Sequence, residues 1–183
     1  MAKLTREQVV QHLTPPKGIV MAPYPAWRDR IYRGSLLSIG PSLLFVATAE
    51  SLSKAPLLQA AHWLSAAAVV LAALFFLVWL ASWRYAVWAL AIGGLVAIPL
   101  QTTAAWALTL AAGSVMAAKE THCFHFQAGR IIPWWSVATG LTWLFVPHSW
   151  MMTGCWAILG GLWIWLAWDR QSLPLFDIPG TRG

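Results

Sequence analysis

Apolar residues fill five long stretches of the chain, and most polar residues are confined to the segments between them. The stretches cover residues 31–50, 57–80, 83–118, 131–147 and 149–168. About 20 apolar residues cross the hydrocarbon core of a bilayer as a helix. A helix also satisfies its backbone hydrogen bonds internally, as lipid requires. The pattern therefore predicts an all-α fold, a polytopic transmembrane helical bundle.

The third stretch is too long for a single span. As one helix it would measure about 54 Å, whereas a bilayer with its headgroups is about 40–45 Å thick. Its middle carries Pro99 followed by Gln101, Thr102 and Thr103. Proline removes a backbone donor, so the helix is expected to break there. We therefore predict six spans, over residues 31–50, 57–80, 83–100, 102–118, 131–147 and 149–168.

The positive charges predict an orientation for these spans. With six spans, eleven of the twelve Lys and Arg residues fall on the side of the two ends of the chain, and only Lys54 falls on the other. Lys and Arg are retained on the cytoplasmic side, so both termini are expected there. Residues 1–30 form a cytoplasmic segment in this interpretation, without a cleavable signal peptide, and residues 169–183 form a cytoplasmic tail. Thr5 and Gln8 fit a capping box, which predicts a short helix over about 6–13.

Composition narrows the classes of protein further. Hydrophobic residues make up 59% of the chain and charged residues only 10%, whereas a soluble domain carries about 25% charged residues. This excludes a soluble enzyme, a disordered chain and a nucleic-acid-binding module. The two cysteines, Cys123 and Cys155, are too few for a disulfide framework, and their positions in the predicted bundle are too far apart to pair.

The densest group of polar residues follows the fourth predicted span, at Lys119–Phe126. If the helix continues, Lys119, Glu120 and Cys123 lie within about 100° of one face, and a nearby ammonium favours the Cys123 thiolate. This face is the candidate functional surface, with a simple juxtamembrane ion pair as the alternative. His122, Cys123 and His125 resemble part of a metal site, but structural zinc takes four ligands and no second cluster supplies the rest. No catalytic set is recognisable, and no cofactor is indicated.

Tryptophan is abundant, with 14 residues, and most lie near predicted span ends, where the ring suits the headgroup level. Four lie deeper: Trp106, Trp143, Trp156 and Trp163. These four favour packing between helices, with a pigment or quinone site as the alternative. Small residues repeat every four positions at Thr153, Ala157 and Gly161, and at Thr109, Gly113 and Ala117, which is typical of closely packed helices in membranes.

The segment Lys119-Glu120-Thr121-His122-Cys123-Phe124 resembles the Lys-Glu-x-x-Cys-Phe signature of a small bacterial family of integral membrane proteins of unknown function. Residues 28–34 also resemble that family's charged start of the first helix, and Ile131-Ile132-Pro133 resembles the start of the helix after the signature. By position, the resemblance implies that Lys119, Glu120, Cys123 and Phe124 are functional residues, whereas His122 and His125 lie outside the signature. It implies a bacterial inner or intracytoplasmic membrane and no particular activity.

Three functions are compatible with these patterns. The first is a non-enzymatic integral membrane protein that acts as an accessory or assembly subunit of a larger complex, with the lipid bilayer and other membrane subunits as partners. The second is a binding protein or enzyme with a cytoplasmic-face site at Lys119, Glu120 and Cys123. The third is a subunit that contacts a pigment or quinone through the deep tryptophans. The absence of catalytic groups and the small-residue helix faces favour the first.

Overall fold

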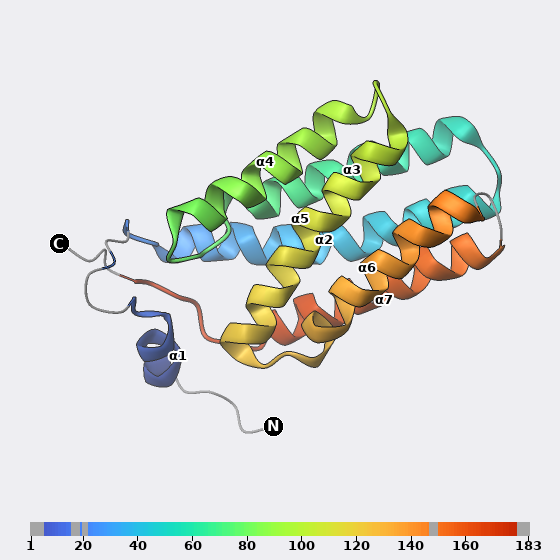
Figure 1. Ribbon diagram of the computed structural model, residues 1–183. Helices are drawn as coiled ribbons and strands as arrows, with labels where there is room; N and C mark the ends of the chain where they lie inside the picture. The colour runs from blue at the N-terminus through green and yellow to red at the C-terminus, as the bar shows by residue number, and fades with distance from the viewer. Residues whose placement is uncertain (1–5, 16–18, 20–21, 147–149, 179–183) are drawn as a thin grey trace.

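A computed structural model describes residues 6–15, 19, 22–146 and 150–178. Among these residues it contains seven helices and no strand, apart from one isolated bridge between Tyr24 and Ile178 (Figure 1). The short helix α1 spans Arg6–Leu13, as predicted; Thr5, its predicted cap, lies outside the described residues. The long helices are α2 (Ala26–Ser51), α3 (Ala55–Leu74), α4 (Ala81–Ala97), α5 (Thr102–Phe124), α6 (Gln127–Phe145) and α7 (Trp150–Gln171).

The predicted break in the third apolar stretch is confirmed. Helix α4 ends at Ala97 and α5 begins at Thr102, with Pro99 between them. Gln101 caps α5, because its side-chain oxygen accepts a hydrogen bond from the Ala104 N–H at 3.1 Å. Gln101 therefore satisfies one of the N–H groups that the start of a helix leaves unpaired.

Several helix ends differ from the apolar boundaries. Helix α3 ends at Leu74, and residues 75–80 form a non-helical linker although they are all apolar. This linker is held by polar contacts from elsewhere: the Tyr24 hydroxyl donates to the Phe75 carbonyl at 3.0 Å, and the Trp79 indole donates to the Leu13 carbonyl at 2.8 Å. The hydropathy of residues 75–80 does not reveal these hydrogen bonds. Helix α5 continues through Phe124, past the expected end of its apolar run.

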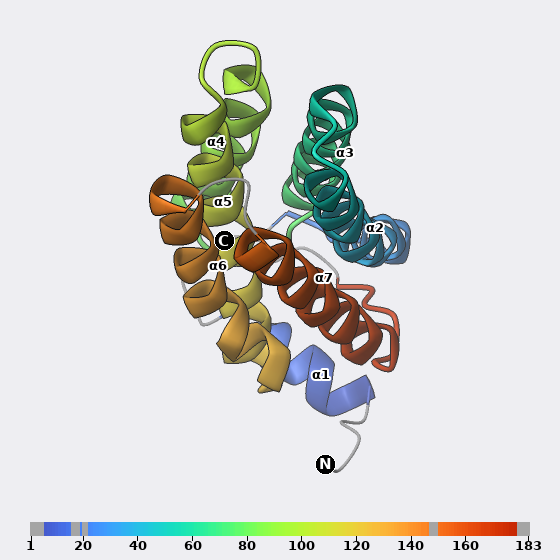
Figure 2. The ribbon, with the colours of Figure 1, turned by 90° about the vertical axis from the view of Figure 1, so that its right-hand side faces the viewer.

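The six long helices run alternately in the two directions along one bundle. Helix α2 packs between α3 and α7, α5 packs against α4 and α6, and α6 packs against α7 (Figure 2). The starts of α2, α4 and α6 therefore share one end of the bundle with the ends of α3, α5 and α7, and α1 lies beside that end (Figure 1). We call it the charged end, because its residues include Asp29, Arg33, Lys119, Glu120 and Arg170.

Close approach of helices depends on particular glycines. A Cβ on Gly40 of α2 would lie 2.5 Å from Ile164 Cγ1 and 2.8 Å from the Gly160 carbonyl oxygen of α7. Gly113 lies against Trp163, as expected for the small-residue repeat on α5. On α7 the predicted Gly161 is not at a close contact, since a Cβ there would meet nothing within 4 Å, whereas its neighbour Gly160 lies against α2.

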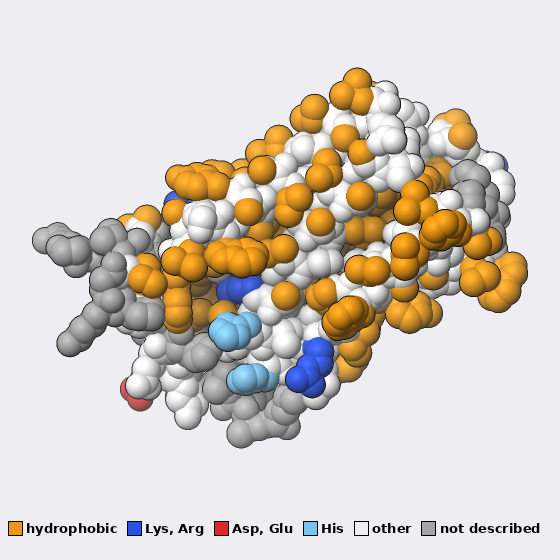
Figure 3. Space-filling view, in the orientation of Figure 1, with side chains coloured by type: hydrophobic (Ala, Val, Ile, Leu, Met, Phe, Trp, Pro, Cys, Tyr) orange, Lys and Arg blue, Asp and Glu red, His pale blue; other side chains and the backbone are white. Residues whose placement is uncertain are grey.

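The outer surface of the bundle is strongly apolar. Trp134, Phe145 and Trp150 are each more than 75% exposed, and hydrophobic side chains cover much of the face seen in Figure 3. Within the described residues, three helices, α2, α3 and α7, are long and apolar enough to cross a membrane, judged by length and composition. Soluble proteins rarely expose continuous apolar patches of this kind, so the surface is suited to contact with lipid.

Candidate functional site

Five charged side chains form a buried network at the charged end, which we call the ion cluster: Asp29, Arg33, Lys119, Glu120 and Arg170. Arg170 lies at its centre, with Nη2 2.7 Å from Asp29 Oδ1 and Nε 3.1 Å from Glu120 Oε2. Arg33 Nη2 lies 2.8 Å from Asp29 Oδ2, and Lys119 Nζ lies 2.9 Å from Glu120 Oε1. Asp29, Glu120 and Arg170 are fully buried. Arg170 therefore joins two carboxylates that would otherwise be buried without a shared counter-charge.

Each member of the ion cluster comes from the end of a long helix. Asp29 and Arg33 are one turn apart at the start of α2, a spacing that places both side chains on the same face. Arg170 is in the last turn of α7, where a cation also interacts favourably with the helix dipole. Tyr32 adds a neutral donor, because its hydroxyl donates to Glu120 Oε1 at 2.9 Å.

The segment after α7 closes over the ion cluster. Arg33 donates to the carbonyls of Leu173 and Pro174, both at 2.6 Å, and the Phe176 N–H donates to Asp29 Oδ2 at 3.2 Å. The Phe176 ring lies 4.1 Å from the Arg170 guanidinium carbon, on the scale of a cation–π contact. Backbone and aromatic groups thus cover the part of the cluster formed by Asp29, Arg33 and Arg170.

The predicted functional face is only partly a surface. Helix α5 does continue past Lys119, and Lys119 does pair with Glu120, but Glu120 is fully buried under the ion cluster. The expectation that Glu120 is exposed was therefore wrong, because its partners Tyr32 and Arg170 come from two other helices and enclose it. Phe124 is also buried, and its ring packs against Phe176 with centroids 5.6 Å apart.

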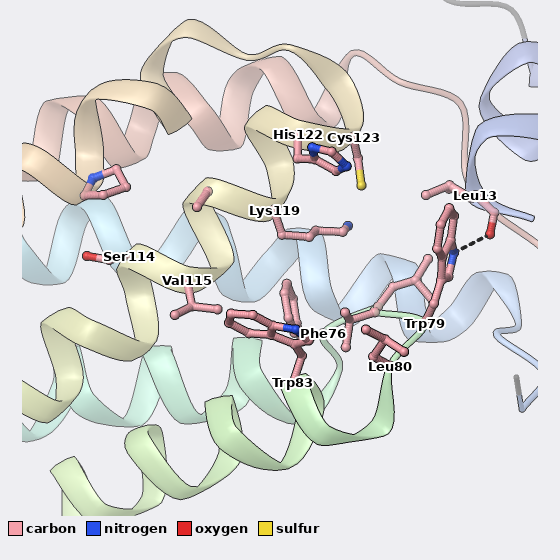
Figure 4. A pocket seen from close by; sticks show the side chains of 14 residues that line it. Leu13, Phe76, Trp79, Leu80, Trp83, Ser114, Val115, Lys119, His122 and Cys123 are labelled. Atoms are coloured by element: carbon pink, nitrogen blue, oxygen red, sulfur yellow. Dashed lines mark hydrogen bonds between the residues drawn. The ribbon is translucent and has the colours of Figure 1, made fainter. Parts of the chain in front are cut away.

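Lys119 and Cys123 instead border a pocket of about 660 Å³ between α4, α5 and the linker 75–80 (Figure 4). Its wall is mostly apolar, with Lys119, His122 and Cys123 following one another along the last turns of α5 and Ser114 lying farther back on the same helix. Figure 4 shows the Lys119 side chain extending between these residues and the rings of Phe76 and Trp83. The remaining lining residues are Leu13, Leu77, Val78, Trp79, Leu80, Ser114, Val115, Ala118 and Pro133.

The Cys123 thiol is less acidic than its position beside a lysine suggests. Burial raises its pKa and outweighs the opposite effect of the Lys119 ammonium. The Lys119 ammonium does favour the thiolate, as expected, but burial of the charged form has the larger effect and was not considered in the sequence-based prediction. Cys123 is suited to lining an apolar pocket rather than to nucleophilic chemistry at neutral pH.

We expect alkylation of Cys123 to be slow and strongly dependent on pH. In a Cys155→Ser background, Cys123 should react with a small maleimide several-fold more slowly at pH 8 than a cysteine introduced at the exposed position Gln127, because less of it is thiolate. The difference should narrow as the pH approaches 10. Mass spectrometry of timed reactions measures both rates, and equal rates at pH 8 would contradict the raised pKa.

His122 and His125 were considered as possible metal ligands together with Cys123. Helix α5 ends at Phe124, and His125 adopts a left-handed backbone conformation with φ of 57°. Within the described part of the chain, no three His, Cys, Asp or Glu side chains lie close enough together to hold a metal ion. His122 remains relevant in another way, because it is exposed at the edge of the pocket.

The deep tryptophans form an aromatic core. Trp106 stacks on His62 with ring centroids 3.7 Å apart, and it contacts Trp156 with centroids 4.3 Å apart. No hydrogen-bond partner among the described residues reaches His62 Nε2 or the two indole nitrogens. The cavity beside Trp106 measures about 10 Å³, which is close to the least volume that holds one water molecule. This cavity has no room for a pigment or quinone ring.

Sequence reasoning missed Asp29, Tyr32, Arg33 and Arg170 as parts of a common site. A signal was present, since charged residues bordering an apolar stretch are costly to bury and usually have partners. Comparison with protein-family models, curated proteins and solved structures gave no match for this chain. The site is therefore interpreted from its own geometry.

Proposed function

We propose that this protein is a membrane protein that binds a small amphipathic molecule in the pocket beside Lys119, His122 and Cys123. The observation that carries the proposal is the composition of this pocket, a mostly apolar hollow of about 660 Å³ with Lys119, His122 and Cys123 along one part of its wall. Small-molecule sites are typically about 300–1,000 Å³, mostly apolar, with a few polar groups that orient the ligand. Two of these residues, Lys119 and Cys123, belong to the Lys-Glu-x-x-Cys-Phe segment that the sequence singled out, whereas His122 lies outside that signature.

The proposal includes six membrane spans, with both termini and the pocket on the cytoplasmic side. Its support is the distribution of cations along the bundle. Five of them gather toward the charged end: Arg33, Arg84, Lys119, Arg130 and Arg170. Lys54 lies at the opposite end, between α2 and α3. Cytoplasmic loops carry an excess of Lys and Arg, so this asymmetry supports a cytoplasmic position for the charged end. The pocket then lies near the level of the lipid headgroups, where an amphipathic ligand has its natural position.

Reporter fusions test this topology directly. Fusions at Lys54 and Gln101 should report the outside, and fusions at Arg84 and Gln127 should report the cytoplasm, because the charged end carries nearly all the cations. Paired reporters, one active on each side of the membrane, measure both outcomes in the same strain. A cytoplasmic signal at Gln101 would show that α4 and α5 do not form two separate spans.

Filling the pocket should abolish binding. A long-chain alcohol that carries a diazirine near the end of its chain is the probe, and the full-length protein in phosphatidylcholine nanodiscs is irradiated with it. Crosslinks should map to residues 76–83 and 114–123 by peptide mass spectrometry, and should fall several-fold in Ala118→Trp, whose new ring occupies the pocket. Ala107→Trp on the same helix is the matched control, because Ala107 is exposed and does not line the pocket.

If the probe instead labels all lipid-facing helices equally, and Ala118→Trp does not change that labelling, the proposed binding in the pocket is wrong. The interpretation as an accessory or assembly subunit would then be the better one. That function would be supported by a stable stoichiometric partner after extraction in mild detergent. The exposed apolar side chains favour neither function, since lipid covers them as well as a partner does.

A further inference from the structure

The ion cluster contains more positive than negative charge, and its excess faces the pocket. Two carboxylates, Asp29 and Glu120, are paired with three cations, Arg33, Lys119 and Arg170. Asp29 is enclosed by both arginines and by the Phe176 N–H, and Glu120 is enclosed by Arg170, Lys119 and Tyr32. One positive charge is thus left over in a region where water is largely excluded.

Lys119 is the member of the cluster through which this charge reaches the pocket. It is the only one of the five that lines the pocket, and its side chain is 12% exposed whereas that of Glu120 is fully buried. Its ammonium has three donors and uses one on Glu120 at 2.9 Å. The ammonium also lies 5.7 Å from the centre of the Phe76 ring and 5.2 Å from that of Phe124, so its surroundings are apolar. A charge in such surroundings interacts strongly with an opposite charge.

Resting on the proposed function, we infer that the ligand is an amphiphile with a single negative charge on its headgroup, a carboxylate or a phosphodiester. The headgroup accepts hydrogen bonds from Lys119, with His122 beside it at the rim, and the tail occupies the chamber between Phe76, Trp83 and Val115. A monoanion neutralises the excess charge of the cluster. A cationic headgroup would instead add a fourth positive charge to the same region.

A headgroup series tests the inference in wild-type protein. Four diazirine probes with the same chain carry a hydroxyl, a carboxylate, a glycerol phosphodiester or a trimethylammonium group, and each is crosslinked at pH 8 in phosphatidylcholine nanodiscs. The monoanions should label the pocket about tenfold more efficiently than the alcohol, as expected for a charge-assisted hydrogen bond, and the cation less efficiently than the alcohol. The comparison of carboxylate with phosphodiester shows whether the ligand resembles a free fatty acid or a phospholipid.

Variants of Lys119 show whether this residue provides the selectivity. In Lys119→Gln the tenfold preference for the anions should disappear, and in Lys119→Arg it should remain. Labelling by the alcohol in each variant is the internal control that the pocket is intact. If Lys119→Gln does not fold, the wild-type headgroup series and Lys119→Arg still decide the inference.

The possible results separate the two proposals. Equal labelling of the pocket by all four probes, or a preference for the cation, would overturn the inference about charge and leave the pocket as a binding site for neutral molecules. Failure of every probe, including the alcohol, to label the pocket would overturn the proposed function and the inference together. Anion preference that persists in Lys119→Gln would show that another group selects the headgroup.

Discussion

Replacement of Arg170 by methionine should destabilise the protein by about 3–5 kcal/mol, the range found when one partner is removed from a buried ion pair. Arg170 is fully buried and is the only residue of the ion cluster that contacts both carboxylates. Methionine fills similar space but removes the guanidinium that both carboxylates share, so that Asp29 keeps only Arg33 and Glu120 keeps only Lys119 in a medium where charge is costly to bury. The measurement is the unfolding transition in mixed micelles as the denaturing detergent is increased.

The matched control is Arg130→Met, because Arg130 is exposed at the same end of the bundle. It should shift the transition by no more than about 0.5 kcal/mol, as is usual for surface substitutions. Adding Glu120→Gln to Arg170→Met should recover part of the lost stability, because the second substitution removes a fully buried carboxylate that has lost one of its two cations. Equal stability of the Arg170→Met and Arg130→Met proteins would show that the cluster is not a source of stability.

Replacement of Gly40 by alanine should cost about 1–3 kcal/mol, the usual effect of adding a methyl group to a packed interior. The new Cβ would overlap Ile164 and the Gly160 backbone, and the carbonyl oxygen of Gly160 cannot turn away without disturbing α7. Helices α2 and α7 would have to separate, and their separation would disturb the ion cluster that both carry. The same detergent titration measures the loss.

Gly34→Ala on the same helix provides the comparison. A Cβ on Gly34 would meet nothing within 4 Å, so alanine should be neutral there, or stabilising by up to about 1 kcal/mol through its helix propensity. A Gly40→Ala protein as stable as Gly34→Ala would mean that α2 and α7 are less closely packed than described. Gly160→Ala should resemble Gly40→Ala, because it meets the same contact from the other helix.

The helices could be predicted because each depends on a local pattern. Apolar runs marked the long helices, and Pro99 with the polar residues behind it marked the division between α4 and α5. The linker 75–80 could not be predicted in this way, since the hydrogen bonds from Tyr24 and Trp79 that hold it involve residues far along the chain. Hydropathy is calculated over a short window of neighbouring residues, whereas these hydrogen bonds join residues that are far apart in the sequence.

In the candidate site, too, features that depend on one helix could be predicted, and features that depend on several helices could not. Lys119 and Cys123 were identified from a helical wheel, and both line the pocket. The wheel could not show that Glu120 is covered by residues of α2 and α7, because a wheel describes a helix without neighbours. Nor could it show the apolar wall of the pocket, which is contributed mainly by the linker and the start of α4. A site formed by the ends of several helices can be recognised only once the packing of those helices is known.

The distance along the chain between Asp29 and Arg170 constrains how the molecule is made. The two residues that form the central ion pair are 141 positions apart, and α2 is synthesised before any of the helices that cover its charged start. While synthesis and membrane insertion continue, Asp29 has only Arg33, one turn away, to balance it. The arrival of α7 supplies Arg170, and the segment after it supplies the Leu173 and Pro174 carbonyls and the Phe176 N–H. The charged start of α2 therefore reaches its final surroundings only after α7 and the segment that follows it have been made.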